Sequence, residues 1–556
     1  MPRDESESQV DRRTLLKAVG GAAATVSVAG CGGAQNTPTE GDGGDDGGDT
    51  QDDTDTPMDD DETEDTPTDD GGEESFSVGV TLGQMDSGLD PHDHAETPTN
   101  IIVSQAYEGL MGRDKEGAII AKLATEWERV EPGTARFTLR DGVTFQNGDD
   151  LTSEDVRYSI RRIETEEVGG ALPQDGDLAG TGTLENVEAG DGEVTVTFGG
   201  LNPIVFQLFA TNGQVMQQSW VEENGTDFIN RNVNGTGPFQ LTGYESGTSV
   251  SYENYGDYWG EPAAADELTI TASSESSTRV NQLLAEETDI VTNVPPQEIS
   301  RVQSSDVASV NPVPSTRIIF LQMRYDIEPF SSQQFRQAMN YAVDVQSIIE
   351  NVLQGFGEIT GQPTLSQFTG HNPDIEPYGY DPDEAERLVE ESGHAGVDIT
   401  LQTPIGRYLR DVEIAQAAAN QIDSLSNVNC ELQQREFNSL VQDVTAPNIE
   451  DRPPFTLLGW GNGEFDAAQT IIPLLTSGGP LTVLQNEEVD SLIEQAQSEP
   501  DPQEREQILQ QTNQLLHDLA PWVFLHQQFS VYGVSNGIQW QPRPDELIDV
   551  WTATQN

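Results

Sequence analysis

The segment from residue 32 to residue 74 most constrains how this chain can fold. It holds 18 acidic residues and no Lys or Arg, and Met58 is its largest apolar side chain. Such a composition buries too little apolar surface to offset the conformational entropy lost on ordering. We therefore expect a disordered spacer here, with a reach of roughly 35 Å for a flexible coil of this length. The folded body is then confined to residues 75–556.

The acidic excess extends into that body. The 556-residue chain has 97 acidic and 26 basic residues, a formal net charge of -71, and the body alone holds 75 acidic against 22 basic residues. This field repels nucleic acid and anionic membrane surfaces, which excludes them as main partners. Only three of the cations are lysines: Lys17, Lys115 and Lys122. Excess carboxylate with so little Lys is typical of surfaces that stay hydrated in concentrated salt, so we expect a halophilic source.

The N-terminus has the layout of an export signal. Arg12 and Arg13 are followed by Leu-Leu-Lys and by an apolar run over residues 18–29, which predicts a twin-arginine signal. The run is too short to span a bilayer, which needs about 20 residues. It ends at Val-Ala-Gly before Cys31, which resembles a lipobox, where the chain is cut before the cysteine and lipid is attached to its thiol.

We therefore predict a signal over residues 1–30 and a lipid-anchored acidic stalk over residues 31–74. The mature protein would be an exported lipoprotein of the halophilic archaeal type, held at the outer face of the cell membrane through Cys31. The alternative is a short buried helix with a chance cysteine. Cys430 is the only other cysteine, and its alternation with apolar neighbours predicts a buried strand residue.

Helical and strand patterns alternate through the body. Phe76, Val78 and Val80 alternate with small or polar residues and predict a strand. Residues 152–155, Thr-Ser-Glu-Asp, predict a helix start. A second helix is predicted from a capping Asp381, with Pro at the first turn, to Gly393. The fold class is therefore mixed α/β.

Catalytic motifs are mostly missing. None of the lysines lies in a Gly-Lys-Ser/Thr context, so the chain has no Walker P-loop. Residues 533–537 match the G-x-S-x-G elbow around Ser535, but the Pro-rich segment that follows cannot form the helix that the elbow needs. We expect a Gly-rich hairpin turn there, and an exported serine hydrolase is the alternative.

Histidine and asparagine patterns leave two further alternatives open. His92 and His94 could share a metal, as in a receptor for nickel or a metallophore, but no third ligand stands at a diagnostic spacing. We expect a solvated loop and no metal or cofactor. Asn224 and Asn234 each begin an Asn-x-Thr sequence, which is a glycosylation acceptor in exported chains and also arises by chance.

Several segments together resemble the extracellular solute-binding proteins of the peptide and nickel class that serve ABC importers. Any one of these motifs is weakly specific, and their shared order across residues 75–530 is strong. They are Tyr107-Glu108-Gly109-Leu110, 121–127 (AKLATEW), 137–145 (FTLRDGVTF), Asn147-Gly148, 152–156, 235–239 (GTGPF), 254–260 (NYGDYWG), 335–344 (FRQAMNYAVD) and the Asp381 helix.

The resemblance implies a two-lobed fold with a hinge and an extra inserted domain. The first lobe would combine residues 75–108, 232–312 and 526–556. The inserted domain would be 109–231, and the second lobe 313–525. A ligand would be enclosed between the lobes, and closure would present a surface to membrane permease subunits. The implied function is binding of short peptides or a similar small organic solute for transmembrane transport, not catalysis.

Site residues follow from the same resemblance. In peptide-binding relatives, an acid three residues after a Gly-Trp pair holds the ligand's amino terminus, whereas Gly463 stands there in this chain. Glu464 or Asp466 could substitute, and Arg407 resembles an arginine that meets the ligand carboxylate. The predicted ligand-binding residues are Arg407, Tyr408, Trp460, Asn462, Glu464 and Asp466. Arg407 could instead pair with a surface acid, and Trp460 could instead pack within the second lobe.

Overall fold

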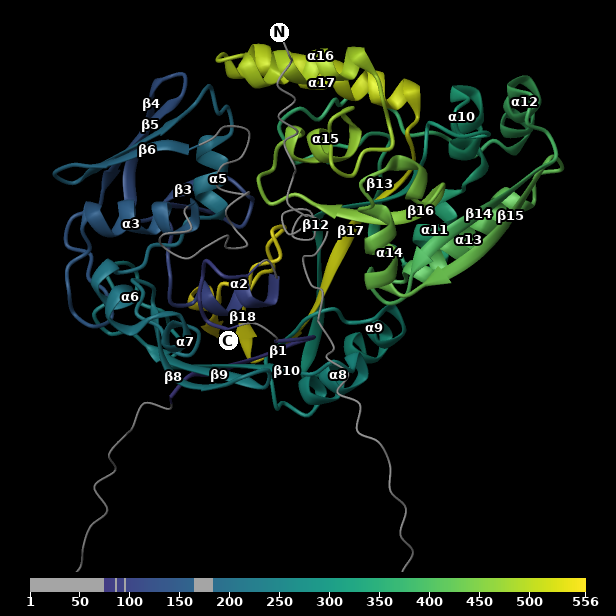
Figure 1. The fold of residues 1–556 in the computed structure, drawn as a ribbon. Coiled ribbons are helices and arrows are strands. Elements are labelled where there is room, and N and C mark those ends of the chain that lie inside the picture. Colours follow the sequence, from purple (N-terminus) through teal and green to yellow (C-terminus); the bar gives the residue numbers. More distant parts are fainter. Residues whose placement is uncertain (1–74, 86–87, 95–96, 165–183) are drawn as a thin grey trace, which may run out of the picture. The chain divides into compact units, whose positions relative to one another are not determined.

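A computed structural model describes residues 75–85, 88–94, 97–164 and 184–556 (Figure 1). The predicted signal with Arg12 and Arg13, the lipidation site Cys31 and the acidic stalk lie outside the described residues. Within the described ranges, no helix is both long and apolar enough to cross a membrane.

One large mixed sheet runs through the body. Its strand order is β15-β14-β16-β12-β17-β11-β1-β10-β9-β8, and β13 pairs with β17 beside this path. β1 is parallel to β10 and β11, whereas β12 and β17 are antiparallel. The strands are β1 (Ser77–Leu82), β8 (Phe239–Glu245), β9 (Ser249–Asn254), β10 (Glu267–Ala272), β11 (Ile290–Val291), β12 (Ala308–Met323), β13 (Gly357–Ile359), β14 (Val397–Pro404), β15 (Val428–Arg435), β16 (Phe455–Gly461) and β17 (Trp522–Ser535).

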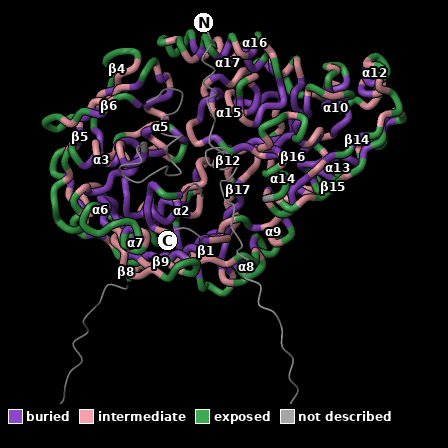
Figure 2. Tube along the Cα trace, viewed as in Figure 1, coloured by how far each residue is buried: buried purple, intermediate pink, exposed green. Residues whose placement is uncertain are grey.

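β12 and β17 connect two separate apolar cores. Their pairing runs from Ala308 opposite Ser535 to Gln322 opposite Trp522, with a register shift between Pro314 and Ile318. One end packs with β1, and the other packs with the helices that cover β14 and β16. The predicted lobe boundaries at 312/313 and 525/526 therefore fall inside continuous strands, where a hinge would bend two paired strands. Figure 2 shows that these central strands are largely buried.

Helices lie over both halves of this sheet (Figure 1). One group packs with the β12, β14 and β16 cores: α10 (Gln333–Ala342), α11 (Val345–Asn351), α12 (Pro382–Ser392), α13 (Asp411–Asp423), α14 (Phe437–Val444), α15 (Ala468–Leu475), α16 (Glu487–Ser498) and α17 (Pro502–Leu519). The other helices of this part are α2 (Thr97–Val103), α8 (Ser276–Leu284) and α9 (Pro296–Gln303).

A smaller antiparallel sheet with its own core lies within residues 109–231. Its order is β4-β5-β7-β6, with β4 (Ala124–Glu131), β5 (Thr134–Leu139), β6 (Leu184–Ala189) and β7 (Glu193–Phe198), beside a β2–β3 hairpin (Met111–Arg113, Ile119–Ala121). The helices here are α3 (Ser153–Glu164), α5 (Val205–Thr211), α6 (Gln218–Asn224) and α7 (Thr226–Ile229). The predicted start of α3 is confirmed, because Thr152 Oγ1 accepts from the Asp155 amide and Asp155 Oδ2 accepts from the Thr152 amide.

Two further local predictions, the helix from Asp381 and the buried strand position of Cys430, are also confirmed. The Asp381 side chain caps α12 by accepting from the Glu384 amide over 3.0 Å, and Gly393 ends the helix in a left-handed conformation. A left-handed C-cap favours glycine because it has no Cβ. Cys430 is a buried residue of β15, and its thiol is free within the described residues.

The chain ends in a short segment beyond β17. β18 (Ile538–Gln539) pairs with β19 (Thr554–Gln555), and a 3-10 turn, η2, covers Val550–Thr552. The expected hairpin around Ser535 is therefore wrong, since β18 pairs with β19 and not with β17. Residues 536–537 form a tight turn, in which Ser535 Oγ accepts from the Gly537 amide over 3.1 Å.

Candidate functional site

A cavity of about 630 Å³ lies where distant segments meet. Its wall combines the end of α2 and the residues after it, the β2–β3 hairpin, the end of α5, Gly463 and the C-terminal segment 539–554. These segments come from all three predicted domains. Small-molecule sites in proteins usually measure about 300–1,000 Å³. The cavity is therefore large enough for a small organic solute.

Glu108, at one wall of this cavity, holds four chain segments together. Its carboxylate accepts from Tyr258 Oη over 2.9 Å and from Trp259 Nε1 over 2.7 Å. It also accepts from Thr236 Oγ1 and from Lys122 Nζ, over 3.1 and 3.3 Å. Hydrogen bonds to a buried charged acceptor are stronger than neutral ones. The four donors come from three family motifs, 121–127, 235–239 and 254–260, so one buried carboxylate gives these motifs a common structural role.

The Gly235-Thr236-Gly237 motif places backbone directly against residue 106. A Cβ on Gly235 would lie 1.9 Å from the Ala106 carbonyl oxygen, and one on Gly237 would lie 2.8 Å from the Ala106 carbonyl carbon. Only glycine fits such an approach. The close contact positions Thr236 to reach Glu108.

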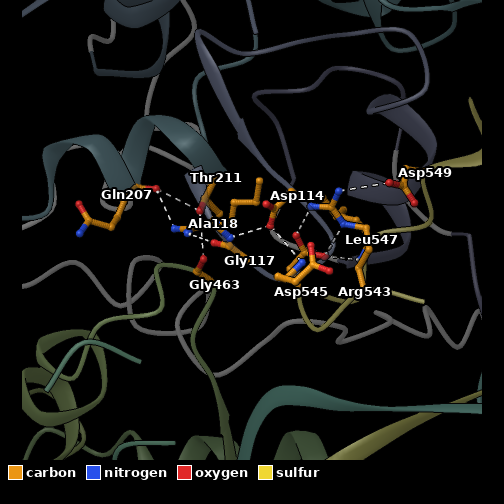
Figure 3. A network of polar contacts seen from close by, with 12 residues as sticks. Asp114, Gly117, Ala118, Gln207, Thr211, Gly463, Arg543, Asp545, Leu547 and Asp549 are labelled. Carbon is orange, nitrogen blue, oxygen red and sulfur yellow. Dashed lines mark hydrogen bonds and ion pairs between the residues drawn. The ribbon is translucent and has the colours of Figure 1, made fainter. Parts of the chain in front are cut away.

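The C-terminal wall is built around Arg543, which is 5% exposed. Its Nε donates to Asp545 Oδ1 over 2.9 Å, and its Nη1 donates to Asp549 Oδ2 over 3.2 Å (Figure 3). Burial opposes the charged form, but the two carboxylates raise the pKa of Arg543. Burial also raises the pKa of Asp549, against the effect of Arg543. Sequence reasoning missed this cluster, whose only local signal is one Arg followed by three acids within residues 543–549.

Arg113 joins the hairpin to the loop after β16. Its Nη1 donates to the Gly117 carbonyl over 2.9 Å and its Nη2 to the Glu464 carbonyl over 3.1 Å. The guanidinium lies 4.6 Å from the centre of the Phe465 ring. Thr211 Oγ1 donates to the Gly463 carbonyl over 3.1 Å (Figure 3). Residues 463–465 are thereby held against the β2–β3 hairpin and α5. Because of burial, the pKa of Arg113 is lowered.

The predicted site residues of this loop have different surroundings. Asp466 is fully buried, and its two oxygens accept from Arg505 Nη1 and Nη2 over 2.7 and 2.8 Å. Asn462 Nδ2 donates to the Asp466 carbonyl and to Thr470 Oγ1. Glu464 is half-buried, and burial raises its pKa although Arg113 opposes this. Asp466 and Asn462 therefore shape the loop, and Glu464 is the acid beside the cavity-lining Gly463.

Trp460 and Tyr408 pack in two different apolar cores, both of which include residues of β16. Trp460 Nε1 donates to the Gln469 carbonyl over 3.2 Å, and its ring belongs to a buried apolar cluster. Tyr408 Oη donates to the Gly459 carbonyl over 3.1 Å. A Cβ on Gly459 would lie 2.7 Å from the Tyr408 ring, so the Gly before Trp460 makes room for Tyr408.

Arg407 is half-buried between two aromatic rings. Its guanidinium lies 5.1 Å from the centre of Tyr408 and 5.3 Å from that of Phe437. Burial, together with the nearby Arg317, lowers the pKa of Arg407. Its backbone amide donates to Asp411 Oδ2 over 2.7 Å. Among the described residues, the cavity lining includes Gly463 but none of the six predicted ligand-binding side chains.

The expectation of a solvated loop at His92 and His94 is wrong, since both side chains are buried. His92 Nδ1 accepts from Arg162 Nη1 over 3.0 Å, so its Nε2 carries the proton and donates to the Gln214 carbonyl over 2.7 Å. Burial, reinforced by Arg162, lowers the pKa of His92 to about 3. Arg162 also pairs with the buried Asp90. No group of three or more His, Cys, Asp or Glu suited to a metal occurs in the described part of the chain.

The two glycosylation candidates differ in accessibility. Asn224 is exposed at the end of α6. Asn234 is buried, and its Nδ2 donates to Gln217 Oε1 over 2.8 Å. Its Oδ1 accepts from the Asn147 amide. Of these two asparagines, only Asn224 has a side-chain amide that is accessible to a modifying enzyme in the folded chain.

Comparisons with known proteins agree with this fold. Residues 118–481 match the family model "Bacterial extracellular solute-binding proteins, family 5 Middle". The chain is 24% identical over 463 residues to heme-binding protein A of Haemophilus influenzae, covering 77% of this chain and 82% of that one. It is 24% identical over 431 residues to the dipeptide-binding protein of Escherichia coli, covering 72% and 80%.

The fold itself is shared with solved structures. The ABC transporter substrate-binding protein CtaP of Listeria monocytogenes superposes with a TM-score of 0.78 at 20% identity, covering 87% of this chain and all of the other. The mixed α/β class and the two-lobed binding-protein fold are thus confirmed. Since the family model spans more than half of the chain, the protein belongs to family 5 of the extracellular solute-binding proteins.

Proposed function

We propose that this chain is the solute-binding receptor of an ABC importer and that it captures short peptides or a similar small organic solute. The observation that carries the proposal is the cavity bounded by Gly463, because the wall at that point includes the position from which peptide-binding relatives hold a ligand amine. The dipeptide-binding relative supports the same ligand class.

The lining of the cavity suits a polar solute with charges of both signs. Four of its residues are basic, Arg113, Lys115, Lys122 and Arg543, and four are acidic, Glu108, Asp114, Asp545 and Asp549. Tyr107, Trp540 and Trp551 add apolar surface. Binding sites combine apolar walls with a few fixed polar groups in this way. A short peptide carries both charges, polar amide groups and apolar side chains, so it fits this wall.

Capture works by closure. The contacts of Arg113 and Thr211 with residues 463–464 join segments that belong to different predicted domains. A ligand that adds contacts across the same gap stabilises the closed form over the open one. Glu464 and Arg407 do not line the cavity, so within this proposal they contact the ligand only after closure, Glu464 accepting from a ligand donor group and Arg407 donating to an acceptor group. The closed form is then the one that a permease recognises.

Export and anchoring complete the proposal. Cleavage of the twin-arginine signal before Cys31 and lipidation of its thiol place the receptor at the outer face of the cell membrane. Two long acyl chains hold firmly, because each buried methylene contributes about 0.8 kcal/mol. The acidic stalk then spaces the binding domain from the membrane, and the acidic body belongs to a halophilic cell surface.

The direct test is a thermal-shift screen of the mature chain in molar KCl against di- to pentapeptides, with nickel chloride and nickel–histidine as separate probes. The proposal predicts that a subset of peptides raises the melting temperature and that the metal probes do not. A shift with nickel alone would favour the metal-receptor alternative. A Ser535→Ala variant should bind the same peptides, since no helix follows Ser535 to form a nucleophile elbow.

A further inference from the structure

Several residues of the cavity wall have a buried polar atom with no hydrogen-bond partner among the described residues. Three are donors: Arg113 Nε, Asn212 Nδ2 and Trp540 Nε1. Two are acceptors: Gln214 Oε1 and Asp549 Oδ1. All five residues are at most 8% exposed. Buried polar groups in native proteins are normally satisfied, so their concentration at one cavity points to a partner that is supplied from outside the chain.

The acids of the wall are mostly saturated by the protein itself. Glu108 already accepts four hydrogen bonds. Asp114 accepts from the amides of Glu116 and Ala118 (Figure 3), and Asp545 accepts from Arg543 and from the Leu547 amide. Asp549 Oδ1 is the buried acidic oxygen of this wall that has no partner among the described residues. The wall therefore offers an incoming group more donors than acceptors.

Both lysines of the described residues line this cavity, in a body with 75 acidic residues. Lys122 Nζ donates to Glu108 and lies 5.2 Å from the centre of the Trp551 ring. Lys115 Nζ donates to Gln541 Oε1 over 3.0 Å and lies 3.8 Å from Glu116. An ammonium group has three donors, so each lysine retains capacity for a further acceptor.

We propose that the Lys115–Lys122 wall, formed by Lys115 in the turn of the β2–β3 hairpin and Lys122 directly after β3, binds the carboxylate of the captured solute. This rests on the proposed function and deepens it, because it assigns ligand-charge selection to the inserted domain rather than to Arg407 alone. A carboxylate supplies the acceptors that the donor-rich wall lacks. The local cations also offset the acidic field that otherwise repels an anion from the body. Rotatable lysine donors adapt to carboxylates at slightly different positions, unlike a rigid guanidinium fork.

The test uses an equimolar pool of tripeptides and the same pool as C-terminal amides, which keep the amine and lose the carboxylate. The mature receptor is equilibrated with both pools in molar KCl and separated from free peptide, and the bound fraction is analysed by mass spectrometry. In the bound fraction, we expect the free-carboxylate peptides to exceed their amides by about tenfold or more, the effect expected for loss of a charge-assisted hydrogen bond. In Lys115→Gln and Lys122→Gln, that ratio should fall at least threefold.

Arg387→Gln is the matched control. It removes one positive charge from an exposed helix position, where Arg387 pairs with Glu384 and Glu391 away from the cavity lining, so its ratio should equal that of the wild type. Lys115 is exposed, which keeps its variant informative if Lys122→Gln disturbs the Glu108 cluster. The assignment would be overturned if the wild type bound acids and amides equally. It would also be overturned if the ratio stayed unchanged in both Lys115→Gln and a folded Lys122→Gln. Either result would leave the receptor function unaffected. Binding of neither pool would contradict the proposed function itself.

Discussion

The indole of Trp259 donates a hydrogen bond of 2.7 Å to the carboxylate of Glu108, across 151 residues of chain. Tyr258 donates to the other carboxylate oxygen over 2.9 Å, and burial together with this carboxylate raises the pKa of Tyr258. The Tyr-Trp pair and the Glu belong to separate sequence motifs, and their contact closes one wall of the cavity. Loss of this carboxylate should therefore affect both stability and the shape of the site.

Glu108→Ala should lower the free energy of unfolding by about 3 kcal/mol or more, because it leaves the Lys122 ammonium, the buried Thr236 hydroxyl and two half-buried aromatic donors without their acceptor. Tyr258→Phe should cost about 1 kcal/mol, the usual value of one hydrogen bond. Urea denaturation at constant high salt measures both. Tyr380→Phe, at an exposed tyrosine, is the control and should change the value by less than about 0.5 kcal/mol. Equal effects at Tyr258 and Tyr380 would contradict the role given to Glu108.

Gly235→Ala tests the close approach to residue 106. A Cβ there overlaps the Ala106 carbonyl oxygen, and overpacking of this kind costs about 1–3 kcal/mol. Gly379→Ala is matched to it, because a Cβ at Gly379 meets nothing within 4 Å. Calorimetric melting of the two variants should show a clear loss for Gly235→Ala alone. A pair of variants with the same melting temperature would show that the backbone moves aside at little cost.

His526 predicts a defined pH dependence. Burial lowers its pKa from 6.5 to about 4, so the unfolded chain takes up a proton first as the pH falls. The stability held by neutral His526 is complete above pH 6.5 and is lost progressively down to about pH 4. Between these pH values, the free energy of unfolding of the wild type should fall relative to that of His526→Leu. The difference should change by about 1 kcal/mol for each unit by which the pH is lowered. Parallel stability curves for the two proteins between these pH values would exclude this titration.

Local sequence patterns predicted elements whose determinants lie within one or two turns of chain. The Asp381 cap, the proline after it and Gly393 all lie in one segment, and α12 forms as expected. Cys430 likewise follows strand alternation. His92 could not be placed in this way, because its burial depends on Arg162, which is 70 residues away.

The candidate site was harder to predict for the same reason. The pairing of Asp466 with Arg505 and the cluster of Arg543 with Asp545 and Asp549 depend on how distant segments pack. The loop 459–466 could be recognised as a motif, but which of its acids faces a ligand depends on its partners. In the structure, Asp466 accepts two hydrogen bonds from Arg505, whereas Glu464 lies beside Gly463.

The charge of the body predicts a salt requirement. With 75 acidic and 22 basic residues, repulsion within the body is screened over about 3 Å at molar salt but over about 10 Å at 0.1 M. The melting temperature should therefore fall steadily as KCl is lowered from molar to about 0.1 M. A melting temperature that does not change with salt would show that screening of the repulsion between acidic residues does not stabilise the body.

The most direct measurement of the central claim is mass spectrometry of solutes that co-purify with the receptor isolated from its own membranes in molar salt. We expect short peptides with free carboxylates, enriched over a mock purification. Elemental analysis of the same untagged protein should find no bound metal in stoichiometric amount. Recovery of stoichiometric nickel, or of no organic solute together with no thermal shift across the peptide library, would contradict the account.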